Sequence, residues 1–166
     1  MIRIRRAGED DFESIWHIFH RVVRRGDTYP YPPDTDREEA RALWMAPPNR
    51  TYVALEGGEV VGTYFIRPNQ PGQGAHVANA GFMVDPGFQG RGVGRAMGAH
   101  ALDEARREGF LAMQFNMVVS TNHRAVALWR ELGFMIAGTI PAAFSHPEHG
   151  LVDAHIMYRK LQERVP

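Results

Sequence analysis

The chain has 166 residues and no cysteine, and its 19 Lys and Arg balance 19 Asp and Glu. This length is typical of one cooperative core, so we expect a single domain over residues 1–166. The lack of cysteine excludes disulfides, thiolate zinc sites and a covalent acyl-cysteine intermediate. Zero net charge argues against nucleic-acid and membrane partners. Because no apolar stretch approaches the roughly 18 residues of a spanning helix, we expect a soluble cytoplasmic protein.

The N-terminal part of the chain predicts a short strand followed by two helices. Residues 2–5 have the composition of a strand, and apolar residues recur at helical spacing over residues 12–23. Thr35 and Glu38 have the spacing of a capping box. A second helix is therefore expected to begin there and to end near Met45, before two prolines.

The next segment predicts a loop, a hairpin and a further strand. Residues 29–33 read Tyr-Pro-Tyr-Pro-Pro, which indicates a stiff loop between the two helices. Gly57-Gly58 lies between apolar runs at residues 52–56 and 59–67, and two glycines suit the tight turn of a β-hairpin. Residues 77–84 predict another strand.

The C-terminal half alternates between helices and strands. The predicted elements are, in order, a helix over 90–105 ended by Gly109, a strand over 112–119, a helix over 125–132 ended by Gly133, and strands over 134–137 and 152–158. The order of the whole chain is β α α β β β α β α β β. This order predicts a mixed α/β (α+β) domain with helices on both faces of one sheet.

A glycine-rich turn has the most chemical content. Glycines at 90, 92 and 94 leave the backbone bare where a strand passes into a helix. The free N–H groups at a helix N-terminus suit a phosphate or pyrophosphate, and Arg91 and Arg95 would add charge-assisted contacts. The alternative is a turn that only tightens the connection. The spacing matches neither the dinucleotide fingerprint G-x-G-x-x-G nor a P-loop.

Two motifs resemble those of a known family. Gln89-Gly90-Arg91-Gly92-Val93-Gly94 resembles the Q/R-x-x-G-x-G/A pyrophosphate loop of the GNAT superfamily of N-acetyltransferases. The segment from Asn122 to Phe134 is similar to that family's second signature, N-x-x-A-x-x-L-Y-x-x-x-G-F. The resemblance implies a GNAT-like, mostly antiparallel central sheet with helices on both faces, and acetyl-CoA as co-substrate.

The resemblance also implies roles for individual residues. Backbone amides from Gln89 to Gly94 would hold the pyrophosphate, Met83 and Val84 would pair with the pantetheine arm along their strand, and Asn122 would hydrogen-bond that arm. The acyl donor would lie where two neighbouring strands splay apart. An amine would attack the thioester directly, and backbone N–H groups around Met83 and Val84 would stabilise the oxyanion.

Trp129 departs from the family pattern, because many members have a tyrosine there that protonates the leaving thiolate. An indole N–H donates a hydrogen bond but is no useful proton source. The loss is tolerable, since a thiol with a pKa of about 8.5 leaves as its anion near neutral pH. The main role expected of Trp129 is packing on the apolar stripe of its helix.

Asn79 departs as well, because a glutamate often serves relatives there as a direct or water-mediated base. An amide cannot take a proton, but its carbonyl can orient an amine. Asn79-Ala-Gly-Phe82, Phe115-Asn116 and Thr121-Asn122 are similar to the proline-analogue (azetidine-2-carboxylate) N-acetyltransferases, a branch in which such asparagines contact the substrate. Asn79 and Asn116 are therefore expected beside the acceptor. The alternative for Asn79 is a structural hydrogen bond where strands separate.

The sequence thus predicts transfer of acetyl from acetyl-CoA to a small-molecule amine, with an amino or imino acid favoured. Two alternatives are a protein N-acetyltransferase acting on lysine or on a chain terminus, and a non-catalytic acyl-CoA sensor. His146 and His149 have spacing that a metal could use but no further ligand nearby, so no metal site is expected. The sequence leaves the acceptor's identity and a homodimer open.

Overall fold

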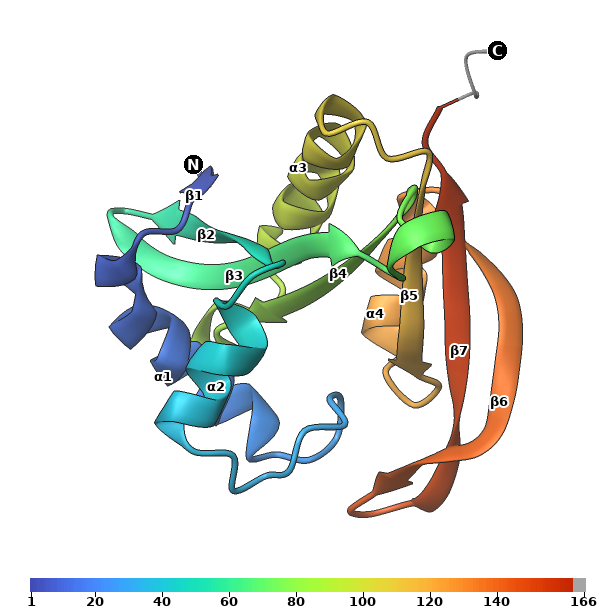
Figure 1. Cartoon of the computed structure of the whole chain (residues 1–166). Coiled ribbons are helices and arrows are strands. Elements are labelled where there is room, and N and C mark those ends of the chain that lie inside the picture. Colours follow the sequence, from blue (N-terminus) through green and yellow to red (C-terminus); the bar gives the residue numbers. More distant parts are fainter. Residues whose placement is uncertain (163–166) are drawn as a thin grey trace.

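The computed structural model describes residues 1–162, within which one seven-stranded sheet has the order β1-β2-β3-β4-β5-β7-β6. Its strands are β1 (Arg3–Arg6), β2 (Arg50–Glu56), β3 (Glu59–Pro68), β4 (Val77–Val84), β5 (Ala112–Val119), β6 (Met135–His146) and β7 (Gly150–Lys160). Neighbouring strands are antiparallel except β4 and β5, which are parallel. The predicted mixed α/β fold with a mostly antiparallel sheet is confirmed (Figure 1).

Helices cover both faces of the sheet, as expected. They are α1 (Phe12–Val23), α2 (Arg37–Trp44), α3 (Val93–Arg107) and α4 (His123–Glu131). The apolar side of α1 and Trp44 of α2 pack with Phe65 and Met83 in one buried cluster. Met97 of α3 and Trp129 of α4 belong to a second cluster on the opposite face. The sheet therefore separates two cores, and its middle strands contact both.

The parallel pair β4 and β5 separates after a short contact. Only Val77 with Ala112 and Ala78 with Met113 are paired. Beyond them the two strands diverge, as Figure 1 shows. The remaining halves of β4 and β5 therefore face each other across a gap within the sheet.

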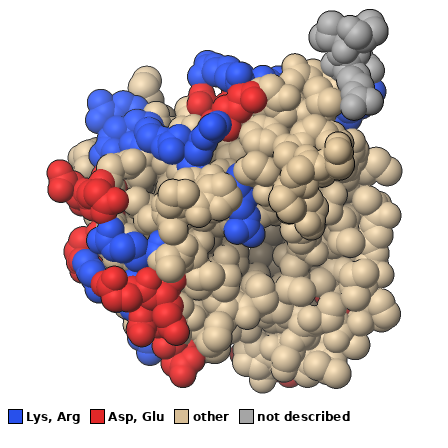
Figure 2. Space-filling model, viewed as in Figure 1, with Lys and Arg blue, Asp and Glu red and all other residues tan. Residues whose placement is uncertain are grey.

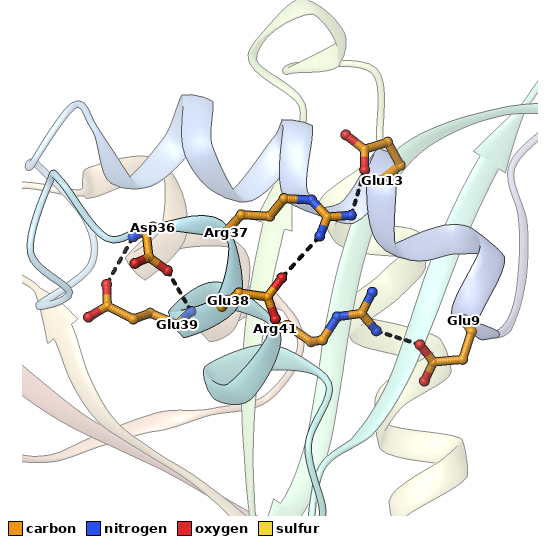
Figure 3. Close-up of polar contacts among 7 residues, drawn as sticks. All are labelled: Glu9, Glu13, Asp36, Arg37, Glu38, Glu39 and Arg41. Atoms are coloured by element: carbon orange, nitrogen blue, oxygen red, sulfur yellow. Dashed lines mark hydrogen bonds and ion pairs between the residues drawn. The ribbon is translucent and has the colours of Figure 1, made fainter.

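The start of α2 corrects one prediction. The capping box is formed by Asp36 and Glu39, whose side chains each accept the other's backbone N–H at 2.9 Å (Figure 3). The hydroxyl of Thr35 instead donates to the carbonyl of Pro32 at 2.5 Å. The sequence has two possible capping boxes one residue apart, Thr35 with Glu38 and Asp36 with Glu39. The second forms because the hydroxyl of Thr35 is already bonded to the preceding loop.

Ion pairs join α2 to the segment around α1. Arg37 pairs with Glu13 of α1 at 2.8 Å and with Glu38 of its own helix at 3.2 Å, and Arg41 pairs with Glu9 just before α1 (Figure 3). Exposed pairs of this kind add little stability. Charged side chains gather on this side of the molecule in Figure 2.

The last two strands are longer than the sequence predicts. β6 continues to His146 and β7 begins at Gly150, so the segment expected to be a loop is mostly a hairpin. The register shifts between Ile136 and Gly138 and again between Ile140 and Phe144. These irregularities break the alternation of apolar and polar residues, which is the signal that a strand prediction needs.

Candidate active site

A cleft of about 960 Å³ opens where β4 and β5 diverge. Its walls come from the loop between α1 and α2, the diverging halves of β4 and β5, the glycine-rich turn, and the first turns of α3 and α4. Figure 2 shows a hollow near the centre of this face, bordered mostly by uncharged residues. The predicted donor residues Gln89, Gly90, Gly92, Val93, Gly94, Arg95, Asn122 and Trp129 all line the cleft.

The glycine-rich turn presents bare backbone to one end of the cleft. Gly90 and Gly92 have φ angles of 77° and 83°, and a Cβ on either would meet no atom within 4 Å. Gly92 begins α3 without a side-chain cap, so the first N–H groups of a 15-residue helix are open to an anion. Gly94 also has a packing role, because a Cβ there would lie 3.3 Å from Leu128 of α4.

The basic residues near this turn differ in their partners. Arg91 pairs with Glu56 of β2 at 3.1 Å and does not line the cleft, so its predicted phosphate contact would need that pair to break. Arg95 lines the cleft and pairs with Glu131. Arg124, which the sequence reasoning missed, also lines it and reaches Gln89 at 3.5 Å. Arg124 could have been predicted as a cleft residue, because it lies in the first turn of α4, just after Asn122 of the second motif.

On the edge of β4 that faces the cleft, the main-chain N–H and C=O groups belong to Phe82 and Val84. Main-chain groups of successive residues point to opposite edges of a strand. The N–H of Asp85 donates to Val61 of β3 at 2.9 Å, so Met83, two residues earlier, also faces β3. Met83 and Val84 both line the cleft, but the main chain of Met83 belongs to the β3 ladder and its side chain to the buried cluster under α1. Pairing of Met83 with a donor arm therefore stays a prediction, and Val84 has the free main-chain edge.

Asn79 and Asn116 are brought to the same cleft, as their predicted shared role requires. Asn79 is 7% exposed, and its Nδ2 donates to the carbonyl of Gln114 at 3.0 Å, where β4 and β5 separate. This is the structural bond considered as an alternative for Asn79. Asn116 is exposed, accepts a hydrogen bond from Gln114 and donates to Asn69 at 2.8 Å.

Arg67 and two tyrosines at this end were missed by the sequence reasoning. Arg67 lines the cleft, donates to Oδ1 of Asn79 at 3.4 Å and lies over the ring of Phe65. No carboxylate of the described residues lies within ion-pair distance of it. Tyr29 and Tyr31 stack at 5.5 Å and also line the cleft. Burial raises the pKa of both phenols.

The second motif positions α4 against the cleft. The side chain of Asn122 caps this helix by accepting the N–H of Ala125 at 3.2 Å. Trp129 is 7% exposed and packs on Phe82 and Phe115 at ring distances of 4.7 and 4.6 Å. The packing role expected of Trp129 is therefore present, with part of the residue reaching the cleft.

The two histidines of the last hairpin stack on each other at 4.5 Å, and His146 lines the cleft. His146 is the last residue of β6. Over residues 1–162, no cluster of three or more His, Asp or Glu side chains could hold a metal ion. None of the helices in that range combines the length and apolar character needed to cross a bilayer.

Comparison with known proteins places this cleft in a family context. The model of the acetyltransferase (GNAT) family matches residues 12–134. N-acetyltransferase aca1 of Schizosaccharomyces pombe is 30% identical in an alignment that covers 89% of this chain and 79% of that protein. The ribosomal protein bS18-alanine N-acetyltransferase of Escherichia coli is 38% identical over 74 residues, covering 45% of this chain and 49% of that protein.

Solved structures agree with the sequence comparison. A GCN5-related N-acetyltransferase from Kribbella flavida superposes with a TM-score of 0.92 at 49% identity, covering 96% of this chain and 98% of that one. The protein yncA from Salmonella typhimurium, solved with its cofactor acetyl-CoA, has a TM-score of 0.84 at 25% identity over 100% of this chain and 97% of that one. With the glycine-rich turn, the splayed strands and the family match in agreement, the chain belongs to the GNAT family of acetyltransferases, which use acetyl-CoA.

Proposed function

We propose that the protein transfers acetyl from acetyl-CoA to the nitrogen of a small amino or imino acid. The observation that carries this is Arg67, a guanidinium in the cleft without a carboxylate partner among the described residues, beside Asn79. A guanidinium binds a carboxylate through charge-assisted, often paired hydrogen bonds. The free carboxylate of an amino acid would supply the missing partner.

The polar groups near Arg67 are amides that could orient an amine by hydrogen bonds. The cleft end formed by Asn79 and Asn116 offers amide oxygens that can orient a nitrogen but cannot take its proton. Because neither amide can act as a base, the nitrogen of the acceptor would lose its proton to solvent. The likeness to azetidine-2-carboxylate N-acetyltransferases at these positions supports the same acceptor class.

The donor would lie along the gap between β4 and β5. Its pyrophosphate would bind the bare backbone around Gly92, and its arm would pair with the free edge of β4 at Val84. The chain has no cysteine that could form an acyl-enzyme intermediate, so the amine would attack the thioester of acetyl-CoA directly.

A second candidate is acetylation of a protein N-terminus, which the bS18-alanine N-acetyltransferases among the relatives favour. The N-terminal residue of a peptide has no free carboxylate to pair with Arg67. The two functions therefore differ in one chemical group on the acceptor.

That difference defines the experiment. Acetyl-CoA is incubated with amino and imino acids including azetidine-2-carboxylate, with the matched carboxamides, and with alanine-terminal and lysine-bearing peptides, and release of free thiol is followed. We expect the free acids to react at least about tenfold faster than their carboxamides, the loss expected for a missing charged hydrogen bond. Turnover of peptides alone would establish the second candidate, and binding of acetyl-CoA without turnover of any amine would indicate a sensor.

A further inference from the structure

The hydroxyl of Tyr29 makes two hydrogen bonds to one residue of β4. It accepts the N–H of Phe82 at 2.7 Å and donates to the carbonyl of Phe82 at 2.7 Å. Tyr29 comes from the loop between α1 and α2, 53 residues away in the sequence. A side chain therefore takes the place that a neighbouring strand would have on this edge.

The position of this contact follows from the divergence of β4 and β5. Pairing ends at Ala78 and Met113, so the groups of Phe82 that face β5 have no strand partner. Phe82 and Tyr29 both line the cleft. The N–H of Phe82 is thus a backbone donor in the middle of the gap, and the phenol oxygen of Tyr29 accepts it.

The ring of Tyr29 is packed between aromatic side chains, while its hydroxyl lies at the cleft. Its ring stacks on Tyr31 at 5.5 Å with a 15° angle between the planes, and meets the edge of Trp44 at 5.9 Å. Burial raises the pKa of its hydroxyl above the ordinary value of a phenol. The hydroxyl is consequently an uncharged hydrogen-bond donor near neutral pH.

We propose that Tyr29 O–H and Phe82 N–H together form the oxyanion site of acyl transfer. The carbonyl oxygen of the thioester takes over the N–H of Phe82, and the phenol turns its O–H from the Phe82 carbonyl to that oxygen. As the amine nitrogen bonds to the carbonyl carbon, the C=O electron pair moves onto the oxygen between the two donors. Collapse breaks the C–S bond, the thiolate leaves with its pair, and the nitrogen loses its proton to solvent. This rests on the proposed acyl transfer.

This assignment explains how the site works without the tyrosine of α4 that many relatives have. Trp129 occupies that position and is packed between Phe82 and Phe115. Tyr29 supplies a hydroxyl from the opposite face of the sheet, where the α1–α2 loop lies. It acts on the oxygen of the reacting carbonyl and leaves the thiolate to depart unprotonated.

The test combines kinetics with a carbonyl signal. Tyr29→Phe keeps the ring in its stack and should lower kcat about 100-fold, the usual loss for one oxyanion donor, with the KM for acetyl-CoA within about threefold of the parent. Isotope-edited infrared spectra of bound ¹³C-carbonyl acetyl-CoA, taken without acceptor, should show the carbonyl stretch at higher frequency in Tyr29→Phe than in the parent. A purely structural role for Tyr29 would not move this band.

The control is Tyr52→Phe, which removes a hydroxyl bonded to Glu104 outside the cleft and should leave kcat and the band unchanged. If Tyr29→Phe does not fold, a fluorinated tyrosine at position 29 is a stronger donor and should lower the band further. A turnover within threefold of the parent, or an unmoved carbonyl band in either variant, overturns the proposal. Failure of every amine to react would overturn the proposed function instead, and the infrared result would still decide the role of Tyr29.

Discussion

The guanidinium of Arg67 donates to the oxygen of Asn79 and lies over the ring of Phe65, and within residues 1–162 no carboxylate forms an ion pair with it. Arg67→Met keeps the apolar stem and removes the charge. We expect the KM for an amino acid acceptor to rise about 10- to 100-fold, with no such change for the matched carboxamide. Initial rates with the two acceptors measure this. Arg24→Met, outside the cleft, is the control, and an equal effect on both acceptors would contradict carboxylate binding by Arg67.

Trp129 allows a second prediction, that no side chain of α4 acts as an obligatory acid. Trp129→Phe should keep turnover within about threefold of the parent, because an aromatic ring still fills the space against Phe82 and Phe115. Trp129→Ala should instead lower the free energy of unfolding by about 3–5 kcal/mol. Chemical denaturation and thiol release measure the two effects. A thousandfold loss of turnover in a Trp129→Phe protein that still binds acetyl-CoA would assign the indole a chemical role.

The residues of the cleft differ in how far sequence could predict them. Asn79 and the glycines were found because motifs place them, although the bond of Asn79 to Gln114 depends on where two strands part. Tyr29 and Arg67 have no local signal, since one lies in a proline-rich loop and the other ends a strand. Their relevance depends on tertiary contacts between segments far apart in the chain, which periodicity cannot reveal.

At the scale of elements, the turn before α3 provides a direct test of donor binding. Gly94→Glu places a negative side chain beside the N–H groups that would hold the pyrophosphate, so acetyl-CoA binding should be lost. The new Cβ lies 3.3 Å from Leu128, so α4 must yield slightly, and thermal melting should verify that the variant folds. Calorimetric titration measures the affinity, with Gly138→Glu as the control in open space. Unchanged affinity in a folded Gly94→Glu protein would refute the phosphate role of the turn.

The order and type of the elements were predictable, and their ends were less so. The hairpin at Gly57-Gly58 was found because both residues need positive φ, which the structure has. The start of α2 shifted by one residue because Asp36 competes with Thr35 for the cap. The long hairpin of β6 and β7 was cut short because its register shifts remove the regular alternation on which a strand prediction depends.

At the scale of the whole molecule, one ion pair ties β1 to the start of α1. Arg5 binds both carboxylate oxygens of Asp11, at 2.7 and 2.8 Å, and this hydrogen bonding lowers the pKa of Asp11. A lowered pKa in the folded state stabilises the protein above the ordinary pKa of aspartate, and that contribution is lost as the pH falls through the lowered value. Asp11→Asn should therefore lower the Tm at pH 7 and have a shrinking effect below about pH 4.

Melting curves of the parent and the Asp11→Asn variant across this pH range test the linkage. The N–H of Gly8 also donates to Asp11, at 2.7 Å, and an asparagine oxygen can still accept it. Asp10→Asn is a suitable control, since Asp10 has an exposed side chain in the same turn. A Tm difference that stays constant from pH 7 to acid would show that the charge of Asp11 does not contribute.

The pairing of β4 with β5 ends after two residue pairs, which leaves a gap within the sheet. A pantetheine arm has amide groups along its length and would lie in that gap as an added strand, with Val84 as a partner. Binding of the donor would then complete the sheet and fasten β5–β7 to β1–β4 along their whole length. Saturation with acetyl-CoA should then raise the free energy of unfolding, by an amount that grows with the logarithm of the ratio of its concentration to its Kd.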